Sequence, residues 1–61
     1  MKFIKVYNTV LCSEFYINVN SIESVFSKNG VTRISPTNSD VSYWEVRETV
    51  DEVMQKIQEA E

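Results

Sequence analysis

The sequence predicts an α+β fold, a small antiparallel β-meander of about five strands closed by one C-terminal helix. Three observations support this class. Apolar and polar residues alternate with a period of two over most of the first 47 positions, Asn29-Gly30 interrupts that pattern, and the period changes to 3.6 after Arg47. The 61 residues form one domain, with a sheet that is either open or curled into a partial barrel.

The first two strands are predicted over residues 3–7 and 14–19, and together they suggest a hairpin. Ile4 and Val6 share one face of the first strand, and every second residue from 15 to 19 is apolar. Residues 8–13 connect the two strands, although Val10 and Leu11 are apolar enough to pack or to extend either one.

The next three strands are predicted over residues 22–26, 31–35 and 41–47. Residues 18–21 favour a turn before the first of them, because Asn and Ser side chains bond their own local backbone. Asn29-Gly30 favours a type I′ hairpin, because both residues tolerate positive φ. Residues 36–40 form a polar loop that begins with proline. We expect sequential strands to pair as neighbours.

A helix is predicted from residue 50, where apolar residues recur at i, i+3, i+4 and i+7. Thr49 and Glu52 have the spacing of a capping box, and Glu48 and Asp51 add negative charge at the positive end of the helix dipole. So short a helix is marginal alone, and we expect its apolar stripe to dock on the sheet. The predicted core comprises Ile4, Val6, Phe15, Ile17, Ile22, Val25, Ile34, Trp44, Val46, Val50, Val53, Met54 and Ile57. Val25 joins Ile22 on the core face only if a bulge separates them.

A domain of this size gains little stability from its own core, and small domains commonly rely on disulfides, a metal or self-association. Cys12 is the single cysteine and histidine is absent, so an internal disulfide and a Cys/His zinc site are excluded. We therefore expect a homo-oligomer, most simply a homodimer. The unpaired cysteine suits a reducing compartment, and no apolar run is long enough to span a bilayer, so we expect a cytoplasmic protein without membrane insertion.

The candidate protein-interaction residues are Phe3, Tyr7, Tyr16 and Tyr43, which alternate away from the side that the helix covers. Exposed rings on such a face indicate a partner surface, and self-association through this face or a strand edge is the favoured interpretation. Two alternatives stay open. The tyrosines cover a small twisted sheet with their hydroxyl groups in water, or the rings stack on single-stranded nucleic acid.

Enzymatic chemistry is not expected. Histidine, the commonest general base, is absent, and Gly30 is the only glycine, which excludes a glycine-rich phosphate loop. The acidic residues Glu48, Asp51 and Glu52 lack the spacing of a calcium loop and are explained by helix capping. We therefore expect no catalytic residues, no cofactor and no metal.

The order and spacing of several segments resemble the small FlbD/SwrD flagellar proteins. The matching segments are Ile4-Lys5-Val6, Glu14-Phe15-Tyr16-Ile17-Asn18, Ile22-Glu23-Ser24-Val25, Val31-Thr32-Arg33-Ile34 and the stretch from Trp44 to Ile57. That family runs a short meander into a similar ending, but has tight glycine turns where this chain has residues 8–13 and 36–40. The resemblance implies a bacterial accessory protein that supports flagellar motility by protein contacts.

The ending from Arg47 to Glu61 is also similar to that of the carbon-storage regulator CsrA, a small β-rich dimer that binds RNA. A nucleic-acid role would use Arg33 and Arg47 as phosphate partners, although the formal net charge of −3 gives no broad basic face. A mobile-element-encoded inhibitor protein is a further alternative, suited to a compact acidic chain.

Overall fold

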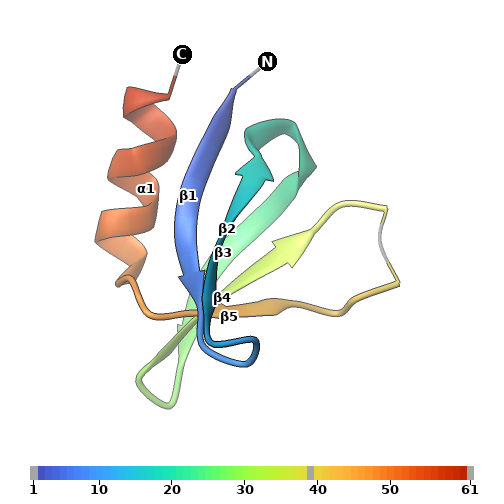
Figure 1. Cartoon of the computed structure of the whole chain (residues 1–61), viewed down its shortest axis with the longest axis vertical. Helices are drawn as coiled ribbons and strands as arrows, with labels where there is room; N and C mark the ends of the chain where they lie inside the picture. The colour runs from blue at the N-terminus through green and yellow to red at the C-terminus, as the bar shows by residue number, and fades with distance from the viewer. Residues whose placement is uncertain (1, 39, 61) are drawn as a thin grey trace.

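The structure is a computed structural model that describes residues 2–38 and 40–60. These residues form five strands, one 3₁₀ turn and one α-helix (Figure 1). The elements in chain order are β1 (Phe3–Asn8), β2 (Ser13–Asn18), η1 (Val19–Ser21), β3 (Ile22–Lys28), β4 (Val31–Pro36), β5 (Trp44–Val46) and α1 (Val50–Glu59). The predicted α+β class, an antiparallel sheet followed by a C-terminal helix, is confirmed.

The strand order in the sheet is β2-β1-β5-β4-β3, and each neighbouring pair is antiparallel. The expected sequential pairing therefore holds except between β2 and β3. η1 carries the chain from one sheet edge to the other, and β5 joins the two hairpins. Because β2 and β3 are the edges, the sheet is open and is not closed into a barrel.

The turns at residues 18–21 and 29–30 lie where the sequence predicts them. Asn29 and Gly30 have φ values of 54° and 79°, the positive values that a type I′ turn requires. The Asn18 side chain accepts the backbone N–H of Asn20 at 2.9 Å and starts η1. At the helix start, Thr49 Oγ1 accepts the Glu52 N–H at 3.1 Å while the Glu52 carboxylate accepts the Thr49 N–H at 3.0 Å. The capping box is confirmed.

A bulge in β3 places Val25 on the core face. Ile22 pairs with Pro36 and Ser24 pairs with Ser35, so one extra residue lies between them on β3. The extra residue reverses the alternation, and both Ile22 and Val25 pack against the core.

Several strand boundaries differ from expectation by one or two residues, and two further differences have a physical cause. The last strand was predicted over residues 41–47 but spans only Trp44–Val46, because register partners on β4 exist only for those residues. Pro36 was expected to open the polar loop, yet it ends β4 and is buried. It pairs there with Ile22 beside the β3 bulge, beyond the last β4 residue that pairs with β5, and proline is tolerated at bulges. Residue 39 of the predicted loop lies outside the described residues.

The core lies between the sheet and α1, which contacts β1 and β3. Its fully buried apolar residues are Ile4, Val6, Ile17, Ile34, Val46 and Val53, all of them predicted. Met54 was also predicted as core, which is wrong, because its side chain is 44% exposed. The buried face of α1 is centred on Val53, and Ile57 and Ala60 pack beside it. Met54 is one residue further, about 100° around the helix, and faces away.

Candidate interaction surface

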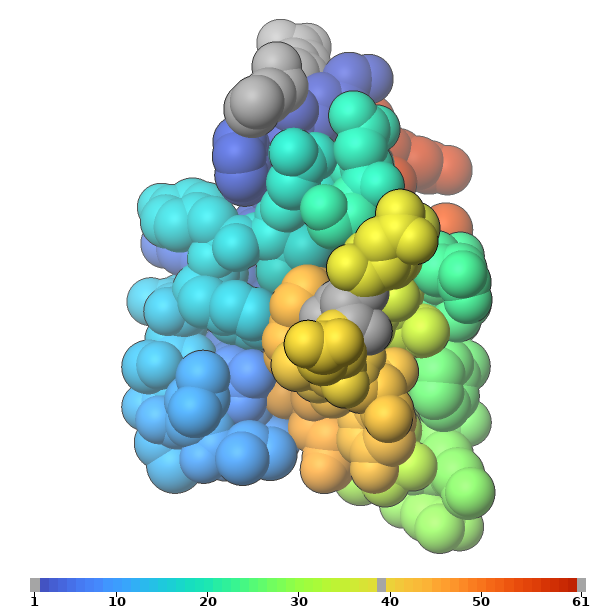
Figure 2. All heavy atoms as spheres, turned by 90° about the vertical axis from the view of Figure 1, so that its right-hand side faces the viewer, coloured from blue at the N-terminus to red at the C-terminus, as the bar shows by residue number. Residues whose placement is uncertain are grey.

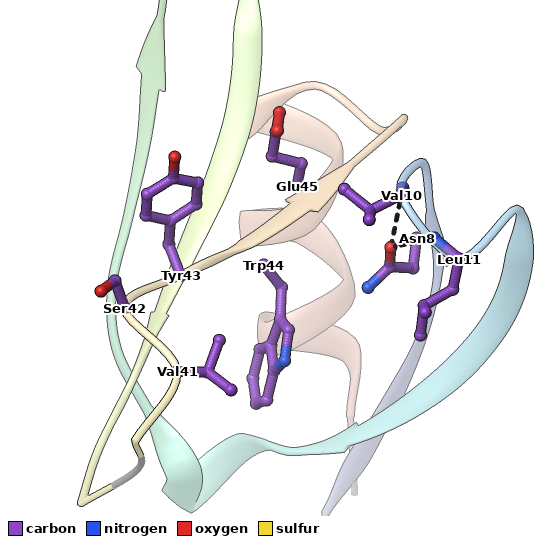
Figure 3. Close-up of a pocket in the computed structure, with 8 residues that line it drawn as sticks. All are labelled: Asn8, Val10, Leu11, Val41, Ser42, Tyr43, Trp44 and Glu45. Carbon is purple, nitrogen blue, oxygen red and sulfur yellow. Dashed lines mark hydrogen bonds between the residues drawn. The ribbon is translucent and has the colours of Figure 1, made fainter.

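The sheet has an outer face, opposite the core, formed by the side chains that alternate with the buried ones. On β1, Ile4, Val6 and Asn8 are buried, whereas Phe3 and Lys5 are exposed. Tyr43, which immediately precedes β5, and Glu45 of β5 project to the side opposite Trp44 (Figure 3). All four predicted interaction residues lie on this outer face, but the structure divides them into two groups.

Phe3 and Tyr16 form the first group and present their rings to solvent. Tyr16 is 68% exposed and Phe3 is 50% exposed. Phe3 pairs with Asn18 and Lys5 pairs with Tyr16, so the two rings are diagonal neighbours across β1 and β2. The Lys5 ammonium lies 3.9 Å from the Glu14 carboxylate on the same face.

The backbone of β2 has an unpaired side, which follows from the hydrogen bonds that are present. The Val19 N–H donates to the Lys2 carbonyl at 2.8 Å, so Val19 points its backbone groups toward β1. Because direction alternates along an antiparallel strand, the N–H and C=O groups of Tyr16 point away from β1. No described strand pairs with that side of β2. Tyr16 therefore combines an exposed ring with free backbone donors and acceptors.

Tyr7 and Tyr43 form the second group, and an arginine covers each ring. The guanidinium carbon of Arg47 lies 4.3 Å from the centre of the Tyr7 ring, and that of Arg33 lies 4.4 Å from the centre of the Tyr43 ring. These are cation–π distances. The Nε of Arg33 is buried and has no hydrogen-bond partner among the described residues. Arg33 and Arg47, the two candidate nucleic-acid-binding residues, are therefore each in contact with a predicted interaction tyrosine.

Charge is unevenly distributed over the molecule. The outer face carries Lys5, Lys28, Arg33 and Arg47 against Glu14, Glu23 and Glu45, as strand alternation, the β3 bulge and the ring contacts place them. The first turn of α1 carries Asp51 and Glu52, and the pKa of Glu52 is lowered because its carboxylate accepts the Thr49 N–H. The outer face therefore has one more basic than acidic residue, although the formal net charge of the protein is −3.

A second feature, absent from the sequence-based expectations, is a groove of about 550 Å³ beside β5. It lies between the β1–β2 turn and the segment that leads into β5, and the two segments lie side by side on one face of the molecule (Figure 2). Its lining residues are Asn8, Val10, Leu11, Val41, Ser42, Tyr43, Trp44 and Glu45 (Figure 3). Val10 and Leu11 lie in the predicted connection and are exposed there, although they are apolar enough to pack or to extend a strand.

Asn8 and Trp44 contribute two side-chain N–H groups to this groove. Asn8 is only 3% exposed, and its Oδ1 accepts the backbone N–H groups of Val10 and Leu11, each at 2.9 Å. The Trp44 ring packs edge-on against Phe15, with ring centres 5.6 Å apart. Asn8 Nδ2 and Trp44 Nε1 donate no hydrogen bond to any described residue, and both nitrogens face the space between the two side chains (Figure 3).

Other kinds of site have no counterpart in the described residues. Within residues 2–38 and 40–60, no group of three or more His, Cys, Asp and Glu side chains is placed to hold a metal ion. In the same ranges, no helix has the length and apolar character needed to cross a membrane. Cys12 is exposed in the β1–β2 turn, where its φ is 56°.

Comparison with protein-family models, with curated proteins and with solved structures finds no match to this chain.

Proposed function

We propose that this protein is a non-enzymatic, self-associating protein-interaction module that forms a homodimer through the free edge of β2. One observation carries the proposal: Tyr16 is 68% exposed on an edge strand whose outward backbone groups are unpaired. Such an edge is a template for another strand, and a neighbouring aromatic pair supplies apolar area. A dimer also supplies the stability that a chain of 61 residues gains poorly from its own core.

β2 suits strand pairing better than β3, the other edge. The register of β2 against β1 runs without interruption from Ser13 to Asn18. β3 contains a bulge and ends in Lys28, two features that protect sheet edges from pairing. Glu14 is the single charged residue of β2, and Lys5 of the same molecule lies beside it.

A two-fold axis at Tyr16 gives the register that fits these side chains. Two copies of β2, antiparallel about this axis, would pair Tyr16 with its own symmetry mate, whose outward N–H and C=O groups are both available. Glu14 would then face Asn18 of the second copy, which avoids opposing two carboxylates across the interface. The two Tyr16 rings and the two Phe3 rings would lie on one face of the extended sheet.

The test is the oligomeric state of two matched lysine variants. Tyr16→Lys places a charge on the β2 edge, and Phe26→Lys places one at the equivalent outer position of β3. Sedimentation velocity over a concentration series should show a dimer for the natural sequence and for Phe26→Lys, and a monomer for Tyr16→Lys.

A monomeric natural sequence at all concentrations would overturn the proposal. Loss of the dimer in Phe26→Lys alone would move the interface to β3. The amide spectrum of each monomeric variant should show the folded sheet, since neither side chain belongs to the core.

We further propose that the dimer acts by binding a second protein in the bacterial cytoplasm. The resemblance to FlbD/SwrD proteins supports an accessory role in motility, with protein contacts and no catalytic residue. Deletion of the gene should then reduce swimming, and Tyr16→Lys should reproduce that loss. Normal swimming in the deletion strain would contradict the motility role but would not affect the proposal that the protein is a dimer.

Single-stranded RNA binding is the second candidate, favoured by the slight excess of basic residues on the outer face. Arg33 and Arg47 lie on that face with tyrosine rings beneath them. Salt-sensitive binding that weakens in Arg33→Ala and Arg47→Ala would support this function. We rank it second because the guanidinium groups cover ring faces on which bases would stack. Absence of a gel shift with single-stranded RNA at low salt would exclude the RNA-binding function.

A further inference from the structure

The groove beside β5 contains two hydrogen-bond donors that the fold leaves unused. Asn8 Oδ1 is committed to the backbone of the turn, which fixes the amide so that Nδ2 faces the groove (Figure 3). Trp44 Nε1 faces the same space from the opposite side. Arg33 Nε is the single buried side-chain nitrogen or oxygen without a partner among the described residues, so Asn8 Nδ2 and Trp44 Nε1 both reach solvent, and a bound acceptor would replace water there.

The surroundings define the chemistry of that acceptor. Val10, Leu11 and Val41 provide apolar walls, and Glu45 is the only charged residue in the lining. No cation lines the groove to balance an anion. The acceptor is therefore neutral, and a peptide carbonyl meets this description.

We propose that the groove binds an extended apolar peptide segment of a protein partner. One backbone carbonyl of the segment accepts hydrogen bonds from Asn8 Nδ2 and Trp44 Nε1, and an adjacent aliphatic side chain packs against Val10, Leu11 and Val41. The groove is open along one face of the molecule (Figure 2), which suits a chain that lies across it. This site deepens the proposed protein-interaction function and rests on it, but uses residues distinct from the β2 edge.

Trp44 makes the proposal directly measurable, because it is the single tryptophan and its indole N–H gives one resonance. The probe is N-acetyl-leucine N-methylamide, titrated into the ¹⁵N-labelled dimer. We expect saturable downfield shifts of the indole proton and of the Asn8 side-chain amide protons in the same titration. An acetylated, amidated Leu-Val-Leu peptide should bind more tightly than this single-residue probe, because it follows more of the groove.

Two variants remove one donor each with little change in shape. Asn8→Asp keeps the oxygen that bonds the Val10 and Leu11 N–H groups but lacks Nδ2. Trp44→Phe keeps a ring beside Phe15 but lacks Nε1–H. Each should weaken binding about fivefold, the usual effect of losing one neutral hydrogen bond. If Asn8→Asp does not fold, Trp44→Phe still decides the question through the Asn8 resonances.

Controls separate this site from the dimer interface. Tyr16→Lys should abolish the dimer and leave the peptide affinity unchanged. Asn8→Asp should weaken peptide binding and leave the dimer intact. N-acetylglycine N-methylamide, which lacks the aliphatic side chain, should bind at least several-fold more weakly.

Three results would overturn the proposal. The first is an indole resonance that does not respond to either leucine probe. The second is equal affinity for a branched alcohol without an amide, which would show a general apolar site. The third is an indole shift on dilution of the protein alone, which would show that a second copy occupies the groove.

Discussion

The Glu48 carboxylate accepts the backbone N–H of Tyr7, with its two oxygens 3.1 and 3.2 Å from the nitrogen. The residues are 41 positions apart, and the contact lies where the chain leaves β5 for α1. The neighbouring Arg47 N–H donates to the Tyr7 carbonyl at 3.0 Å, and the Arg47 guanidinium covers the Tyr7 ring. Tyr7 thereby fastens the start of the helical segment to the first hairpin.

Glu48→Ala should lower the free energy of unfolding by about 1–3 kcal/mol, because a charged acceptor is removed from a partly buried backbone donor. Urea denaturation of the natural sequence and the variant measures this difference. The matched control is Asp51→Ala, an exposed acidic residue in the first turn of α1, with an expected change of about 0.5 kcal/mol. Equal losses in the two variants would mean that Glu48 acts only through the helix dipole.

Val53→Ala and Met54→Ala test which side of α1 is buried. Val53 is fully buried, and removal of two methyl groups should cost about 2–3 kcal/mol with the cavity included. Met54 is 44% exposed, and its truncation should cost less than about 1 kcal/mol. Chemical denaturation of both variants measures the loss in the free energy of unfolding for each. A larger loss for Met54 than for Val53 would contradict the orientation of the helix.

Glu52 should make the stability of the fold depend on pH. Its pKa is lowered in the folded protein, first because its carboxylate accepts the Thr49 N–H, so the folded state favours the ionised form. The contribution is present above about pH 4.3, the ordinary pKa of glutamate, and is lost as the pH falls through the lowered value.

The comparison that checks this dependence is thermal unfolding of the natural sequence and Glu52→Gln from neutral to acidic pH. The natural sequence should be the more stable at neutral pH, and the difference should shrink in acid. A difference that is constant with pH would show that ionisation of Glu52 does not contribute.

Local features of the fold were predictable because their signals lie within a few residues. Asn29-Gly30, the Thr49–Glu52 box and the alternation of Ile4 and Val6 each depend on neighbouring positions and are confirmed. The sequence showed only that Ile22 and Val25 could share the core face if a bulge separated them, because strict alternation places them on opposite faces. The structure contains that bulge.

Features that depend on distant residues were not predictable. The placement of β5 beside β1 has one register pair, Asn8 with Val46, for which the sequence has no marker. The groove between the β1–β2 turn and the segment that leads into β5 follows from that placement. Asn8 was assigned to the connection over residues 8–13, and its buried environment arises only in the folded sheet.

The strand order also has a consequence for synthesis of the chain. The two hairpins, β1–β2 and β3–β4, contain only local pairings and can form as soon as each leaves the ribosome, but the short β5 is the piece that unites them. Until residues 44–46 emerge, the nascent chain consists of two separate ribbons with half a core each. Formation of the complete five-stranded sheet therefore requires β5.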